Sequence, residues 1–150
     1  MSSVRETAIG YGPLVGWWEL VSCEVQFQAS GSRAPMYDAP ARGLIVFGQD
    51  GRVMTVIEVE QDTPRPDHLH RLPASRGMAY TGRYRVDGDR WLTEVDAALI
   101  EGWTGSIQER WFRVEADCLH VCSAWCVSPL HADQVVRAWL QWKRPLQQGA

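Results

Sequence analysis

Apolar and polar residues alternate along most of the chain in short segments that are separated by turn residues. Alternation with a period of two is typical of strands with one buried face. The pattern predicts eight strands, at residues 16–27, 43–47, 53–59, 80–86, 91–98, 105–114, 119–127 and 134–144. The segments Asp50-Gly51 and Asp87-Gly88-Asp89 are typical of tight hairpin turns, because Asp-Gly tolerates positive φ.

A long connection separates the third and fourth of these strands. Residues 60–78 contain three prolines and two histidines and show little periodicity, which is typical of a lid or binding loop. The other connections are mostly short, so consecutive strands are expected to pair as antiparallel neighbours. We therefore expect an all-β fold, an eight-stranded antiparallel up-and-down barrel with room for one small ligand, and a two-sheet sandwich is the alternative.

The bulk composition narrows the function classes. A length of 150 residues suits one domain, with residues 1–12 as an N-terminal extension, and 45% apolar with 22% charged residues is typical of a globular protein. A net charge of -3 without runs of like charge argues against a nucleic-acid partner. No apolar segment reaches the roughly 20 residues that cross a bilayer, and no signal peptide is evident. We therefore expect a cytoplasmic protein with no membrane contact.

Cys118, His120 and Cys122 alternate along one predicted strand and look like a set of metal ligands. Neighbours on one strand face lie about 6–7 Å apart, whereas the ligands of a tetrahedral zinc ion converge more closely. We therefore expect no metal, and we expect these thiols and those of Cys23 and Cys126 to be reduced. Phosphate-binding glycine loops and common catalytic motifs are absent, so no cofactor is expected.

An ordered series of motifs resembles a known family. Gly16-Trp17-Trp18 resembles the Gly-x-Trp start of calycin barrels. The later motifs are residues 43–47 with Asp50-Gly51, residues 80–84 with 87–89, Trp103-Thr104-Gly105 with Gln108 and Arg110, and Ala138, Leu140 and Trp142. Together they are similar to the bacterial lipocalin-like domain family. The resemblance implies an eight-stranded barrel with a ligand cavity, and it places Trp18 at the closed floor.

The chain departs from the family in two places. Members often carry histidines on the fifth strand, where this chain has Thr93 and Glu94, so histidine chemistry at that position is not expected. The lid segment is also shorter than usual. Its two histidines, His68 and His70, are either an acid or base near the mouth of the barrel or solvated loop residues.

Strand alternation then assigns side chains to the cavity. Trp18, Ser22 and Glu24 share one face, which the resemblance turns inward, although Glu24 at a solvated rim is the alternative. The resemblance also turns Arg110 toward this interior, where it either pairs with Glu24 or closes the base of the barrel by stacking on Trp18. The predicted ligand-binding residues are Trp18, Ser22, Tyr80, Gln108, Phe112, Trp125 and Trp142.

The expected ligand is a small apolar or aromatic metabolite, because eight tryptophans favour a flat guest. The first hypothesis is a cofactor-independent cyclase or isomerase of a biosynthetic pathway. In it, Glu24 moves a proton, and Tyr84 or Arg110 stabilises negative charge on a carbonyl. The alternative is a carrier or sensor without chemistry. Exposed Trp17 and Trp139 are candidates for a homodimer contact.

Overall fold

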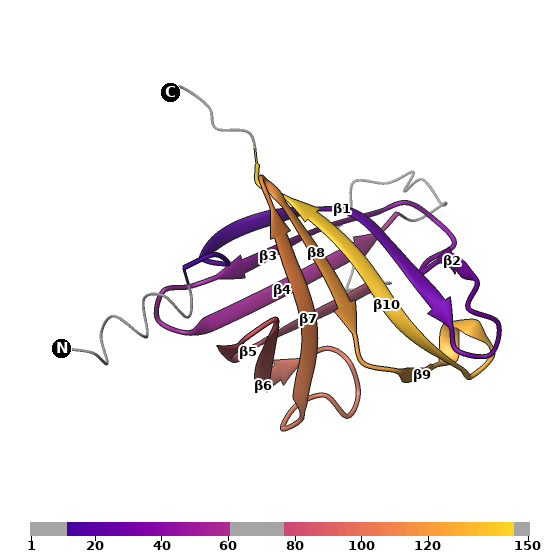
Figure 1. The fold of residues 1–150 in the computed structure, drawn as a ribbon. Helices are drawn as coiled ribbons and strands as arrows, with labels where there is room; N and C mark the ends of the chain where they lie inside the picture. Colours follow the sequence, from indigo (N-terminus) through magenta and orange to yellow (C-terminus); the bar gives the residue numbers. More distant parts are fainter. Residues whose placement is uncertain (1–11, 61–76, 146–150) are drawn as a thin grey trace, which may run out of the picture.

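Figure 1 shows the computed structural model of the protein, which describes residues 12–60 and 77–145. Strands make up nearly all of the regular structure in these residues. They are β1 Gly16–Phe27, β2 Arg33–Pro35, β3 Ala41–Phe47, β4 Arg52–Val59, β5 Gly77–Asp87, β6 Arg90–Ala98, β7 Ile107–Glu115, β8 Cys118–Ser123, β9 Cys126–Ser128 and β10 Gln134–Lys143. A 3-10 turn, η1 Pro129–His131, lies between β9 and β10. None of the described residues forms a helix that is long and apolar enough to cross a membrane.

The strands form one closed barrel. Strands β1, β3, β4, β5, β6, β7, β8 and β10 follow each other around it as antiparallel neighbours, and β10 pairs back onto β1. The short strands β2 and β9 extend the sheet beside β1 and β10. The predicted eight-stranded barrel is confirmed, and the sandwich is excluded because the sheet closes on itself. The predicted strand at 119–127 is interrupted, since β8 ends at Ser123 and β9 begins at Cys126.

Strand β1 contains a β-bulge that reverses the direction of its side chains. The pairing with β10 shifts register between Leu20 and Ser22, so Val21 is an extra residue and is 50% exposed. Trp18 and Val25 are both buried although an odd number of positions separates them, which a regular strand does not allow. The expectation that Ser22 and Glu24 share the inward face of Trp18 is therefore wrong, because the bulge turns both residues outward.

One end of the barrel is filled by aromatic side chains and closed by an arginine. Trp18 is fully buried there, and its Nε1 donates a hydrogen bond to the Leu14 carbonyl at 3.0 Å. The Arg144 guanidinium carbon lies 3.7 Å from the centre of the Trp18 ring, and Arg144 Nη2 donates to the Pro13 carbonyl. The alternative in which Arg110 stacks on Trp18 is wrong, because Arg144 occupies that position.

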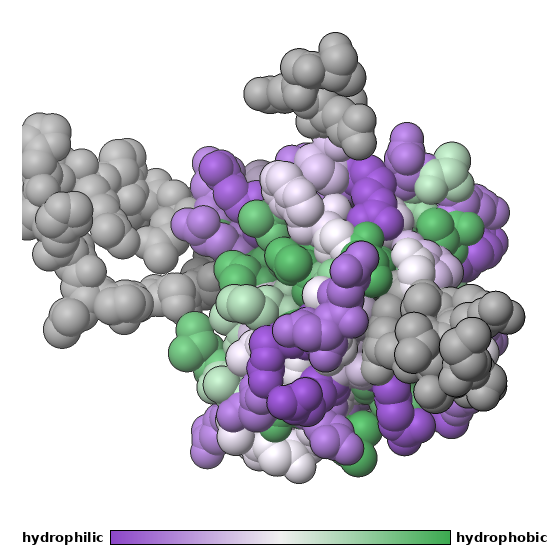
Figure 2. Space-filling view, turned by 90° about the vertical axis from the view of Figure 1, so that its left-hand side faces the viewer, coloured by the Kyte–Doolittle hydropathy of each residue, from purple (hydrophilic) through white to green (hydrophobic). Residues whose placement is uncertain are grey.

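Apolar side chains also gather on the outside of the barrel. The register places Trp17 beside Val46 and Val46 beside Met54, and Leu44 lies beside Val56 in the next row. All five are large and exposed, and in Figure 2 hydrophobic residues cover part of the left half of the visible face. This surface contains Trp17 but not Trp139, which belongs to β10. The homodimer stays a prediction.

Candidate functional site

The barrel interior contains polar atoms that have no hydrogen-bond partner. They are Thr55 Oγ1, Thr93 Oγ1 and Trp91 Nε1, and these side chains are at most 3% exposed. An unpaired polar atom in an apolar interior costs about 1–3 kcal/mol, so native proteins rarely leave one without a purpose. Three such atoms lie in the interior of this barrel, which makes them candidates for contact with a bound molecule.

The strand register places Trp91 and Thr93 two residues apart on the same face of β6, and Thr55 lies farther along the wall on β4. Thr93 on β6 lies opposite Tyr84 on β5 and opposite Gln108 on β7, and Thr55 on β4 lies opposite Tyr80. Gly82 lies between the two tyrosines on β5. A Cβ atom at this glycine would lie 2.9 Å from Thr93 Cγ2, so the missing side chain is what gives the threonine its space.

Arg110 adds a cation to this part of the interior. It lies two residues from Phe112, whose ring packs against the core, and opposite the buried residue Trp91. Its Nη1 donates to the Glu109 carbonyl at 2.9 Å, and its guanidinium carbon lies 5.7 Å from the Trp103 ring. No carboxylate within the described ranges 12–60 and 77–145 forms an ion pair with Arg110. The remaining guanidinium donors are therefore available to a ligand.

A ring contact connects the arginine to the wall. The Trp103 ring meets the Tyr80 ring edge-on, with centroids 5.2 Å apart. Tyr80 is buried. Gln108 Nε2 donates a hydrogen bond at 2.8 Å to Ser106 Oγ, which lies with Trp103 in the connection between β6 and β7. Tyr80, Trp103 and Arg110 thus form one cluster of an aromatic hydroxyl, an indole and a cation.

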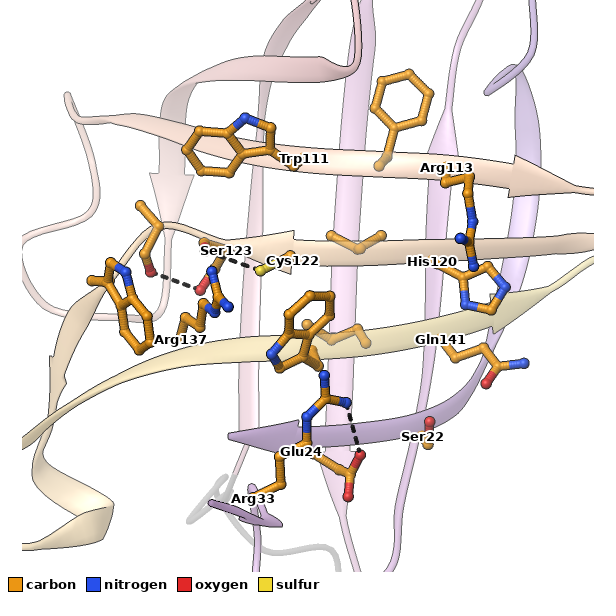
Figure 3. Close-up of a pocket in the computed structure, with 16 residues that line it drawn as sticks. Ser22, Glu24, Arg33, Trp111, Arg113, His120, Cys122, Ser123, Arg137 and Gln141 are labelled. Carbon is orange, nitrogen blue, oxygen red and sulfur yellow. Dashed lines mark hydrogen bonds and ion pairs between the residues drawn. The ribbon is translucent and has the colours of Figure 1, made fainter. Parts of the chain in front are cut away.

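A pocket of about 710 Å³ lies on the outer side of the barrel. Figure 3 shows its side chains projecting from β1, β7, β8 and β10. Ser22, Glu24 and Trp125, which the sequence placed inside, line this outer pocket instead. The bulge in β1 turns the first two outward. The interruption between β8 and β9 leaves Trp125 41% exposed, with the Arg137 guanidinium over its ring.

A sequence model of a lipocalin-like domain matches residues 15–145. The chain belongs to the lipocalin-like domain family. A search of curated proteins gave no match. Membership agrees with the closed antiparallel barrel, and a lipocalin-like barrel indicates binding of a small molecule.

Glu24, the residue that was predicted to transfer a proton, does not face the interior of this lipocalin-like barrel. Glu24 faces outward and lies 3.8 Å from Arg33 Nη1 in an ion pair, so it cannot also pair with Arg110 across the wall. The Tyr84 hydroxyl donates to the Gly48 carbonyl at 2.9 Å, which fixes it beside the turn between β3 and β4. Of the three predicted catalytic residues, Arg110 is the one with free donors facing the interior.

Three other predicted ligand-binding residues belong to the core of the barrel or pack against it. Trp18 and Trp142 are buried in the core, and Phe112 packs against it. His68 and His70 lie outside the described residues. The described part of the chain has no group of three or more His, Cys, Asp or Glu residues that is placed to hold a metal ion.

Sequence reasoning missed Thr55, Trp103 and the buried hydroxyl of Thr93 as interior groups. A signal existed for the two threonines, because each occupies a position that the alternation of its strand turns inward. Trp103 lies in the connection between β6 and β7, where no periodicity assigns a direction. Its place in the cluster depends on contacts between segments that are distant in the sequence.

Proposed function

We propose that this lipocalin-like domain binds, inside its barrel, an apolar ring-containing molecule that carries one hydrogen-bond acceptor. The observation that supports this most strongly is the Arg110 guanidinium without a carboxylate partner in the described residues, near the unpaired hydroxyl of Thr93. Aromatic walls favour a flat guest, and a few polar groups in an apolar site fix its orientation. A carbonyl or carboxylate oxygen would satisfy both donors.

Binding without chemistry is the function that the geometry favours. The strand residues that face inward in the described part of the chain include no aspartate, glutamate or histidine. Histidine and the carboxylates are the side chains that most often serve as general acids and bases near neutral pH. A carrier or sensor needs only the fit and the donors.

A cofactor-independent cyclase or isomerase is the second candidate, and Arg110 with Tyr80 supports it. A fixed cation polarises a carbonyl, and a confining aromatic wall holds a flexible substrate in a reactive conformation. An isomerisation, and a cyclisation that releases no water, conserve mass. A catalytic barrel would therefore convert a compound that co-purifies with it into a product of equal mass and different chromatographic retention, whereas a carrier would release that compound unchanged.

The arginine can be tested with prodan, a neutral naphthyl ketone whose emission shifts to the blue in an apolar site. We expect Arg110→Met to weaken prodan binding about tenfold, because a hydrogen bond from a charged donor contributes about 1.5–3 kcal/mol. Arg113→Met is the matched control, since Arg113 lies on the same strand and faces outward. Equal affinity of wild type and Arg110→Met, or an equal loss in the control, would contradict the proposal.

The unpaired Thr93 hydroxyl gives a second test, in which one substitution is expected to stabilise the ligand-free protein and to weaken ligand binding. We expect Thr93→Val to raise the free energy of unfolding of the ligand-free protein by about 1 kcal/mol, because a methyl group replaces an unsatisfied polar atom. The same change should weaken prodan binding. Thr81→Val is the control and should destabilise, because Thr81 Oγ1 donates to the Val53 carbonyl at 2.9 Å. Urea titration followed by circular dichroism measures both variants, and a destabilised Thr93→Val would refute the assignment.

A further inference from the structure

The outer pocket is separated from the barrel interior by the sheet itself. Along β8, the Val121 side chain belongs to the core cluster, whereas the alternation of the strand turns its neighbours His120 and Cys122 outward into the pocket. The pocket volume of about 710 Å³ falls in the range of small-molecule sites. The ligand proposed for the interior does not account for this outer pocket.

A small residue between two large ones shapes the groove. The register places Trp111 on β7 opposite Cys122 on β8, and Cys122 opposite Trp139 on β10. Adjacent strands lie about 4.8 Å apart, so the two indoles stand on strands about 10 Å apart with a thiol between them. The small thiol between the two large side chains gives the groove its depth at this point.

Arg137 is held rigidly beside this groove. Its Nε donates to Gln26 Oε1 at 2.9 Å, and the same oxygen accepts a hydrogen bond from Trp139 Nε1. The Arg137 guanidinium carbon lies 4.5 Å from the Trp125 ring and 5.0 Å from the Trp139 ring. These contacts fix the guanidinium before any ligand arrives, and they leave its terminal N–H groups without a partner among the described residues.

Of the three arginines at this groove, Arg137 is the one best able to bind an anion. Arg33 is paired with Glu24 at 3.8 Å, and Arg113 is paired with Glu115 at 3.4 Å. No carboxylate in the described part of the chain pairs with Arg137. Burial raises the pKa of the Cys122 thiol, although Arg137 opposes this, so the floor of the groove is a neutral thiol at neutral pH.

We propose that this outer groove is a second ligand site and that it takes a flat aromatic carboxylate. The ring lies between Trp111 and Trp139 above Cys122, and the carboxylate accepts hydrogen bonds from the terminal nitrogens of Arg137 (Figure 3). The site is independent of the barrel interior, so one molecule of each kind binds at the same time.

The test uses naphthoate and its neutral analogue naphthamide, measured by isothermal titration calorimetry on protein that is saturated with prodan. We expect naphthoate to bind with a stoichiometry of one, at least about tenfold more tightly than naphthamide, because only the carboxylate forms charge-assisted bonds with the guanidinium. Arg137→Gln should weaken naphthoate about tenfold and leave naphthamide nearly unchanged. Arg42→Gln is the control, since Arg42 is exposed on β3 and is not a pocket residue.

A second variant keeps the test decisive if Arg137→Gln disturbs the fold. Trp111 is 37% exposed, so Trp111→Leu should remain folded, and it should weaken naphthoate and naphthamide by similar factors because it removes a ring contact. No heat of binding with naphthoate would overturn the proposal. So would equal affinities for the two probes, or unchanged binding in both variants. Loss of naphthoate binding when prodan is present would also overturn it, by showing that both probes use the interior.

Discussion

Replacing Trp18 with alanine is expected to lower the free energy of unfolding by about 3–5 kcal/mol, the usual cost of removing a large buried aromatic side chain. Trp18 is fully buried, its indole donates to Leu14, and Arg144 lies over its ring. The change removes this buried area and both contacts, and it opens the closed end of the barrel. A domain of this size typically has about 5–15 kcal/mol of stability in total, so the loss is a large fraction of it.

The adjacent residue provides the control. Trp17 is 47% exposed on the outer surface, so Trp17→Ala removes an indole of equal size with a far smaller loss of buried area. We expect it to cost about 1 kcal/mol or less. Urea denaturation followed by far-ultraviolet circular dichroism compares the two variants. Similar midpoints would mean that Trp18 does not support the floor of the barrel.

The second large effect is expected at Gly82. In Gly82→Ala the new Cβ would overlap the backbone carbonyl oxygen of Glu94 and press on the Thr93 methyl group. A backbone atom of a paired strand cannot rotate away as a side chain can, so β5 and β6 must separate locally. We expect a loss of about 3 kcal/mol in the free energy of unfolding, at the upper end for overpacking. It should also weaken prodan binding, because the change displaces Thr93.

Gly102→Ala separates crowding from backbone strain. Gly102 has φ of +82°, and a Cβ added there would meet no atom within 4 Å, so its substitution costs conformational energy alone. That cost is about 1 kcal/mol. Gly82 has the opposite character, with a close contact and no positive φ. If thermal melts show Gly82→Ala to be no less stable than Gly102→Ala, the close approach of β5 and β6 at this position is wrong.

The order of the strands could be predicted from the sequence because local turn residues mark the hairpins. Asp50-Gly51 and Asp87-Gly88-Asp89 mark two turns, and the alternation between them fixes most of the inward positions. Inward positions such as Tyr80 and Trp91 follow from this pattern. Closure of the barrel followed from the number of strands and the short connections.

The direction of Ser22 and Glu24 could not be predicted in the same way. A bulge changes the count by one residue, and nothing in the run of residues 16–27 marks Val21 as the extra one. All later side chains on that strand then face the opposite side, so a single unseen residue moved the proposed catalytic carboxylate from the inside to the outside. Trp125 was misplaced for a related reason, an interruption of the strand that follows Ser123.

The pairing of β1 with β10 has a consequence for how the protein is made. Glu19 lies opposite Lys143, so β1 and β10 meet only when synthesis has passed residue 143. Until then the growing sheet has two open edges, and open strand edges are where chains associate wrongly. Folds dominated by such distant contacts also fold slowly. We expect a chain that ends before residue 134 to aggregate during synthesis, however well its first seven long strands are formed.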